Sequence, residues 1–246
     1  MKQTITIALM FFCISANAQI HIGAKGGISI PDLKGNSVQS KGYTSREDAY
    51  LGLIANFQLS RFFSLQPEIN YSPQGGQRNG MQPIPADAMS GIMLPPGVNV
   101  YANFRNSTIL NYLEVPLLLK LTLGHNLKYY LCFGPHIAFL TEAKTKTSGS
   151  SLLYLDAAGT MPLTQNGSEL PPVSFNSTTN IKESIKKVNM GVQGGWGLEY
   201  PVGMGSIFIE GRAIIGLTNI QTHPENDGKN QTGSLVIALG YLIKIK

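Results

Sequence analysis

Apolar and polar residues alternate along eight segments of the chain, and this period of two is typical of β-strands with one apolar and one polar face. The segments are about residues 20–30, 49–59, 62–72, 108–122, 127–140, 187–200, 205–217 and 233–245. Each spans about 9–14 residues, which exceeds the usual ~5–6 of a globular strand and suits a tilted strand that crosses a membrane. Helical periodicity is almost absent, so the pattern predicts an all-β chain.

The connections between these segments alternate strictly between short and long. Short joins are expected near residues 60–61, 123–126 and 201–204, and long joins at 31–48, 73–107, 141–186 and 218–232. Membrane barrels combine short periplasmic turns with long extracellular loops. We therefore predict an eight-stranded antiparallel up-and-down transmembrane β-barrel with both chain ends on the periplasmic side. Residues 181–187 fit either a strand extension or a helix.

Alternation alone does not say which face is inside, because a soluble lipocalin-like barrel would enclose the apolar face. Glycine separates the two cases. Nine strand glycines share the polar face, namely Gly23, Gly27, Gly52, Gly134, Gly191, Gly195, Gly197, Gly216 and Gly240; three, Gly26, Gly194 and Gly211, share the apolar face. Since an eight-stranded barrel has little interior space, small residues belong inside it. The polar face is predicted to line the lumen.

Charged residues on the same face are balanced in sign. The predicted lumen charge network consists of Lys25, Glu68, Glu114, Lys120, Glu199, Glu210, Arg212 and Lys244. Burying an unpaired charge costs several kcal/mol, so enclosed charges should pair. The network is expected either to plug the lumen or to line a narrow polar pathway.

Aromatic residues of the apolar face lie toward both ends of the predicted strands. Phe63, Tyr129 and Tyr200 lie near the short turns, and Tyr71 and Phe139 near the long loops. This placement is typical of the two aromatic girdles at the interfaces of membrane barrels.

Composition agrees with a barrel and excludes other classes. The chain has 246 residues, 43% hydrophobic and only 13% charged, with 27 glycines and a formal net charge of +5. So few charges exclude a disordered chain, and two cysteines exclude a disulfide scaffold. No basic cluster with interleaved aromatics supports nucleic-acid binding.

The N-terminus has the three parts of a secretory signal peptide. Lys2 supplies the positive charge, residues 5–14 the apolar stretch, and Ala16-Asn17-Ala18 the cleavage site. We predict a signal peptide over 1–18 and an outer-membrane β-barrel domain over 19–246. Cys13 lacks the small preceding residues of a lipobox, so lipidation is not expected, and Cys132 becomes the only cysteine after cleavage.

No group of residues indicates catalysis or a cofactor. His125 falls in a turn and His223 in a loop, whereas His21 and His136 share the lumen face. The chain has no Gly-x-Ser-x-Gly nucleophile motif and no zinc-site spacing, and residues 225–228 lack most EF-hand ligands. We expect a non-enzymatic protein without a metal or cofactor.

Several strand segments resemble the PorT-type outer-membrane β-barrel family of Gram-negative Bacteroidetes. The resemblance rests on 22–27 (IGAKGG), 112–120 (YLEVPLLLK), Gly134-Pro135, and 211–220 (GRAIIGLTNI). It implies an eight-stranded barrel in the outer membrane, and some relatives are associated with a protein-secretion apparatus. Many such barrels end on an aromatic residue. This chain instead ends Ile243-Lys244-Ile245-Lys246, although Tyr241 lies close by.

The predicted role is a membrane anchor or assembly component that contacts outer-membrane lipid and binds envelope or secretion proteins through its long loops. An apolar tract, Ile84, Met89, Ile92, Met93 and Leu94, is a candidate binding surface or loop packing. The alternatives are a narrow channel with a charged lumen and a soluble lipocalin-like ligand-binding barrel. The sequence does not indicate an oligomeric state.

Overall fold

The computed structural model describes residues 19–35, 42–84, 99–165, 167–224 and 228–245. The predicted signal peptide, most of the apolar tract near residue 90 and most of the acidic segment 225–228 lie outside the described residues. No helix among the described residues is long and apolar enough to cross a membrane.

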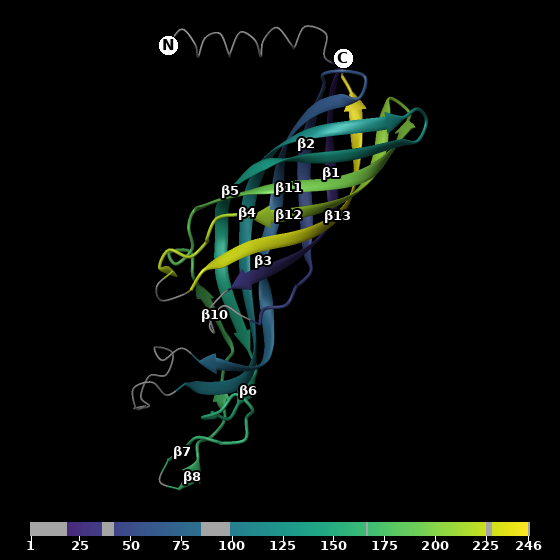
Figure 1. The fold of residues 1–246 in the computed structure, drawn as a ribbon. Helices are drawn as coiled ribbons and strands as arrows, with labels where there is room; N and C mark the ends of the chain where they lie inside the picture. Colours follow the sequence, from purple (N-terminus) through teal and green to yellow (C-terminus); the bar gives the residue numbers. More distant parts are fainter. Residues whose placement is uncertain (1–18, 36–41, 85–98, 166, 225–227, 246) are drawn as a thin grey trace, which may run out of the picture.

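Eight long strands form one antiparallel ring (Figure 1). They are β1 (Ile20–Gly35), β2 (Asp48–Gln58), β3 (Phe63–Ile84), β4 (Val100–Gly124), β5 (Lys128–Ser148), β11 (Val188–Val202), β12 (Gly205–Gly216) and β13 (Asn230–Lys244). Each strand pairs with the next, and the ring closes where β1 pairs with β13, from His21 opposite Lys244 to Gly35 opposite Asn230. The predicted eight-stranded antiparallel up-and-down barrel is confirmed.

One end of the barrel carries three short turns, between β2 and β3, β4 and β5, and β11 and β12. The beginning of β1 and the end of β13 lie at this same end, because His21 pairs with both Asn56 and Lys244. In Figure 1 it is the upper end of the barrel. We call it the short-turn end and the opposite one the long-loop end.

The two faces of the strands have the predicted orientation. Along β5, Tyr129, Leu131 and Phe133 are 56–63% exposed, whereas the intervening Tyr130 and Cys132 are at most 5% exposed. The aromatic residues predicted to form the girdles are all exposed: Phe63, Tyr71, Tyr129, Phe139 and Tyr200. The apolar face therefore covers the outside of the barrel, and a soluble barrel with an apolar interior is excluded.

The glycines of the polar face lie where a larger side chain has no room. A Cβ atom added to Gly27 would lie 2.0 Å from the carbonyl oxygen of Ile237, and one added to Gly197 would lie 2.3 Å from Cζ of Tyr130. At Gly26, on the outer face, the nearest atom would be Cδ2 of Leu51 at 3.4 Å. The crowded interior explains why glycine concentrates on that face.

Strands β3, β4 and β5 continue far beyond the rim of the barrel at the long-loop end. They contain 22, 25 and 21 residues, whereas β2 contains 11. β2 stops pairing with β3 at Tyr71, but β3 continues along β4 to Ile84. We call this projection the head; it comprises residues 75–84, 100–109 and 140–180 within the described part of the chain (Figure 1).

The head also contains five short strands. They are β6 (Ser150–Ser151), β7 (Thr164–Gln165), β8 (Ser168–Glu169), β9 (Val173–Ser174) and β10 (Ser177–Asn180), of which β10 pairs with the outer part of β5. Much of the predicted loops 73–107 and 141–186 is therefore extended sheet. Residues 181–187 are neither strand nor helix: they form turns and one isolated bridge between Ile185 and Gln221.

Three apolar clusters lie inside the barrel at successive levels. Ile54, Leu118, Tyr130, Cys132, Phe208 and Leu242 pack near the short-turn end. Tyr50, Ile214, Val236 and Ala238 form a second cluster. Leu33, Leu110, Tyr112, Ala138, Leu140, Ala143, Ile185 and Ile220 close the long-loop end. Buried polar residues lie between these clusters.

Candidate functional site: the lumen charges and the short-turn vestibule

Four charged residues meet in the barrel interior. Lys25 Nζ lies 2.7 Å from Glu68 Oε2 and 2.8 Å from Glu210 Oε1. Arg212 contacts the same two carboxylates, with Nη1 2.7 Å from Glu68 Oε2 and Nη2 2.8 Å from Glu210 Oε2. Two cations and two carboxylates thus alternate in a closed arrangement that we call the central cluster. The four side chains are at most 1% exposed.

Strand geometry explains how these residues meet. Glu210 and Arg212 are two residues apart on β12, so both point to the same face. Lys25 lies on β1 and Glu68 on β3, and the glycine opposite Lys25, Gly52, leaves space for its side chain on the neighbouring strand. The cluster therefore links three strands that are not neighbours in the ring.

Neutral side chains extend the central cluster. Gln66 and Asn70, on either side of Glu68 along β3, donate hydrogen bonds to its two carboxylate oxygens at 2.7 and 3.0 Å. Gln193 accepts a hydrogen bond from Arg212 at 2.9 Å and donates one to Glu114 at 2.9 Å. These neutral residues share the inner face with the charged ones, but they were not among the residues of the predicted charge network.

Glu114 is connected to the cluster through Gln193 and not through a cation of the set. It is fully buried, and its Oε2 lies 3.9 Å from Nε2 of His136, which is also buried. His136 thus lies on the lumen face, as its parity predicts. Glu114 is the one carboxylate of the predicted network without a lysine or arginine within ion-pair distance among the described residues.

A second ion pair lies closer to the short-turn end. Lys120 Nζ is 3.0 Å from Glu199 Oε2 and 4.0 Å from the centre of the Tyr130 ring. Lys128, which was not among the predicted residues, lies 3.6 Å from Glu199 Oε1, and Ser206 donates to that oxygen at 2.9 Å. Seven of the eight predicted residues are therefore buried in the lumen.

Lys244 is the exception. It shares the inner face of β13, but it is exposed and forms no ion pair with any described residue. Leu242 is the last buried residue of the strand, so Lys244 lies beyond the packed lumen. Its assignment to the lumen charge network was wrong.

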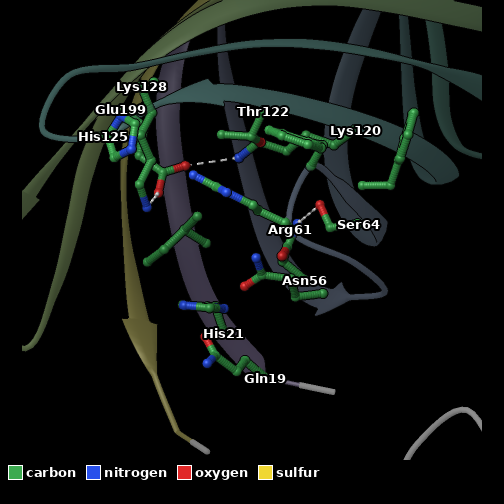
Figure 2. Close-up of a pocket in the computed structure, with 15 residues that line it drawn as sticks. Gln19, His21, Asn56, Arg61, Ser64, Lys120, Thr122, His125, Lys128 and Glu199 are labelled. Atoms are coloured by element: carbon green, nitrogen blue, oxygen red, sulfur yellow. Dashed lines mark hydrogen bonds and ion pairs between the residues drawn. The ribbon is translucent and has the colours of Figure 1, made fainter. Parts of the chain in front are cut away.

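A cavity of ≈ 300 Å³ opens at the short-turn end, between Leu242 and the turns. Figure 2 shows its lining, to which most strands of the ring contribute. The charged residues that line it are Arg61, Lys120, Lys128 and Glu199, and the neutral polar ones include Gln19, His21, Asn56, Gln58, Ser64 and Thr122. We call this cavity the vestibule.

The head has a small core of its own. Val100, Ala102, Phe104 and Leu153 are buried together, and the rings of Phe104 and Phe175 stack with centroids 4.4 Å apart. One loop of the head is organised by Asp156, which accepts hydrogen bonds from the backbone N–H groups of Met161 at 2.7 Å and Thr160 at 3.0 Å. These bonds, that from Met161 foremost, lower the pKa of Asp156.

The described residues contain no group of three or more His, Cys, Asp or Glu side chains that could hold a metal ion. The geometry of the lumen points instead to electrostatic packing. Every charged side chain of the central cluster contacts two opposite charges. Such pairing holds these four groups in their ionised, fully engaged state.

The fold is similar to that of several solved outer-membrane barrels. Ail, the attachment invasion locus protein of Yersinia pestis, is 10% identical, with 92% of this chain and 99% of that chain covered and a TM-score of 0.41. Neisserial surface protein A is 11% identical, with 92% of this chain and 97% of that chain covered and a TM-score of 0.40. The outer membrane protease OmpT of Escherichia coli is 8% identical, with 93% of this chain and 97% of that chain covered and a TM-score of 0.35. No curated protein matches the chain.

A family model gives the assignment that these distant likenesses do not. It describes an outer membrane protein β-barrel domain and matches residues 15–221, which include seven of the eight strands of the ring and all of the head. The match is to this broader family, so a PorT-type affiliation stays a prediction. The chain belongs to the outer membrane protein β-barrel domain family.

Proposed function

We propose that this protein is a non-conducting, non-enzymatic outer-membrane anchor that presents its head outside the cell for binding to another macromolecule. The observation that carries the proposal is the head itself. Three strands extend about ten residues past the rim, which is roughly 30 Å at ~3.3 Å per residue. Most of this projection lies beyond the ring of paired strands that closes the barrel.

The orientation follows from the barrel architecture. Outer-membrane barrels keep their short turns in the periplasm and their long loops outside. With that orientation the head is extracellular and the vestibule is periplasmic. Export requires a signal sequence, and we propose that residues 1–18 serve as the cleaved signal peptide.

The packing of the lumen supports an anchor over the alternative of a narrow channel. The central cluster crosses the interior, and apolar clusters lie on both sides of it. The residues at these levels include Glu114, Leu110 and Leu118, all 0% exposed. A barrel filled in this way leaves no continuous aqueous path, which is usual for eight strands. The charges of the lumen then serve as a structural plug.

The head has the features of a binding module. Its own small core, with the stacked Phe104 and Phe175, gives it a defined shape. β10 lies at the edge of the sheet and all four of its residues are exposed, so its outer backbone groups are available to another chain. A link to protein secretion follows only from the resemblance to the PorT-type family and stays a prediction.

The test removes the head and keeps the barrel. Residues 75–84 and 100–109 pair strand to strand, so deleting 77–107 and joining β3 to β4 by a short turn, together with replacing 147–178 by a Gly-Ser linker, shortens the head in register. We expect the shortened protein to fold and show heat-modifiable gel migration, and to lose the partner that cross-linking captures on intact cells. The matched control replaces residues 203–204 in the short turn between β11 and β12 and leaves the head intact.

Two outcomes would contradict the proposal. Discrete single-channel conductance of the refolded protein in planar bilayers would show that the lumen conducts, especially if Arg212→Gln changes its ion selectivity. Capture of the same cross-linked partner by the shortened and the full-length protein would show that the head is not the binding surface.

A further inference from the structure

The vestibule at the short-turn end has the properties of a ligand site that is separate from the head. Its lining contains three cationic side chains, Arg61, Lys120 and Lys128, and one carboxylate, Glu199. The charge balance of the central cluster, two cations and two carboxylates, does not hold here. The vestibule therefore has a positive excess.

The single carboxylate of the vestibule is already fully engaged. Glu199 accepts a hydrogen bond from Lys120 Nζ at 3.0 Å on Oε2 and one from the Ser206 hydroxyl at 2.9 Å on Oε1. Lys128 approaches that second oxygen only to 3.6 Å, which is outside ordinary hydrogen-bond distance. The ammonium group of Lys128 thus keeps donors free for a further acceptor.

Arg61 is the second cation of the vestibule whose N–H donors are not engaged by a carboxylate among the described residues. It lies in the turn between β2 and β3, forms no ion pair with any described residue, and packs its guanidinium 5.5 Å from the centre of the Phe62 ring. Because both cations line the same cavity, their side chains face a common space (Figure 2). An arginine fork and a lysine ammonium together are the usual partners of carboxylate and phosphate groups.

Neutral donors complete the lining. Asn56 donates to Ser64 at 2.9 Å and so fixes one wall of the cavity. On the neighbouring strand β1, where His21 pairs with Asn56, Nδ1 of His21 is buried and has no hydrogen-bond partner among the described residues. His21 also lines the cavity, so its imidazole adds a neutral polar side chain to the wall.

The cavity is a dead end and not the mouth of a pore. Leu242 lines it and also belongs to the apolar cluster with Leu118, Tyr130 and Phe208, which closes the lumen between the cavity and the central cluster. Its volume of ≈ 300 Å³ lies at the lower limit of the ~300–1,000 Å³ found for small-molecule sites. Since His21, Asn56 and Lys120 face the inside of the ring, lipid has no direct access to them.

We infer that the vestibule binds a small soluble anion from the periplasm through a phosphate or carboxylate group, with Arg61 and Lys128 as the principal ligands. Lys120 and Glu199 form an ion pair at 3.0 Å in the wall of the same cavity. With cleavage after Ala18, as proposed above, Gln19 becomes the first residue, and its α-ammonium group adds positive charge to the cavity that it lines.

The experiment measures anion binding to the refolded mature chain in a zwitterionic detergent by isothermal titration calorimetry. The probes are inorganic phosphate and succinate, in a buffer free of both. We expect saturable binding of at least one probe, and the tighter one identifies the group that the site prefers. Arg61→Ala and Lys128→Ala should each weaken that binding about tenfold or more, the range for hydrogen bonds to charged groups.

The matched control is Lys146→Ala, which removes the same charge from β5 at the opposite end of the molecule. It should leave the affinity unchanged within about twofold. All three side chains lie outside the packed lumen, and heat-modifiable migration verifies that each variant is folded. No saturable binding of either probe, or an equal loss in Lys146→Ala, would overturn the inference.

Discussion

Arg212 and Glu68 face each other across the barrel interior and are joined by two parallel contacts, Nη1 to Oε2 at 2.7 Å and Nη2 to Oε1 at 3.0 Å. Both side chains are fully buried. This two-point geometry is the strongest form of the arginine–carboxylate pair. It joins β12 to β3 through the lumen, where no backbone pairing connects them.

Removing the carboxylate should destabilise the barrel strongly. Glu68→Gln leaves the charges of Arg212 and Lys25 with Glu210 as their only common counter-charge, and breaking one side of a buried pair costs about 3–5 kcal/mol. The free energy of unfolding can be measured with urea in lipid vesicles, with the fluorescence of Trp196, the one tryptophan of the chain, as the signal.

The control is Glu142→Gln, which removes an exposed ion pair with Lys144. Exposed pairs contribute about 0–1 kcal/mol, so this variant should unfold almost as the parent does. Equal stability of the two variants would show that the central cluster contributes little to the fold.

Two neighbouring glycines of β1 provide a second test, because they face opposite sides of the wall. A Cβ atom at Gly27 would lie 2.0 Å from the carbonyl oxygen of Ile237, on the paired strand. Gly27→Ala should therefore force β1 and β13 apart and cost about 1–3 kcal/mol, or prevent folding. At Gly26 the nearest atom is Cδ2 of Leu51 at 3.4 Å, so Gly26→Ala should stay within about 0.5 kcal/mol of the parent. Equal effects in urea unfolding would contradict the assignment of the faces.

The outer surface can be tested with a single charge. Leu239 is 64% exposed near the middle of β13, where it pairs with both Gly26 and Ile209. In a bilayer this position faces hydrocarbon, and Leu239→Arg should cost about 2–4 kcal/mol.

Met204, 84% exposed in a short turn, is the matched position outside the hydrocarbon. Met204→Arg should change the unfolding free energy by no more than about 0.5 kcal/mol. If both arginine variants unfold alike in vesicles, the surface around Leu239 does not contact lipid.

The barrel could be predicted from the sequence because period two encodes a face directly. The burial of Lys25 and Glu68 followed from parity, since a residue and its second neighbour must point the same way. Parity does not encode depth, and Lys244 shows the consequence: it points inward but lies beyond Leu242, the last buried residue of its strand.

The head could not be predicted in the same way. Residues 72–76 of β3 are all buried, so the alternation that marks a barrel wall is lost where the strand enters the head. Its extension depends on pairing with β4, from Gly75 opposite Ile109 to Ile84 opposite Val100, and such pairing is not written in either segment alone. The vestibule was missed for a similar reason: Arg61 lies in a turn, and it lines one cavity with Lys128 only because β3, β4 and β5 pair side by side.

Cys132 gives a test of the inner face that needs no substitution. It is buried among the apolar residues of the lumen and is a free thiol, whereas its neighbours Leu131 and Phe133 are exposed on the outside. We expect a water-soluble maleimide to leave Cys132 unmodified in the folded mature protein and to modify it fully in urea, as followed by intact mass. The control, Met204→Cys combined with Cys132→Ser, places a thiol in the exposed turn and should react within minutes. Modification of Cys132 in the folded protein at the rate of that control would mean that reagent enters the lumen, and the plugged barrel on which the anchor proposal rests would be wrong.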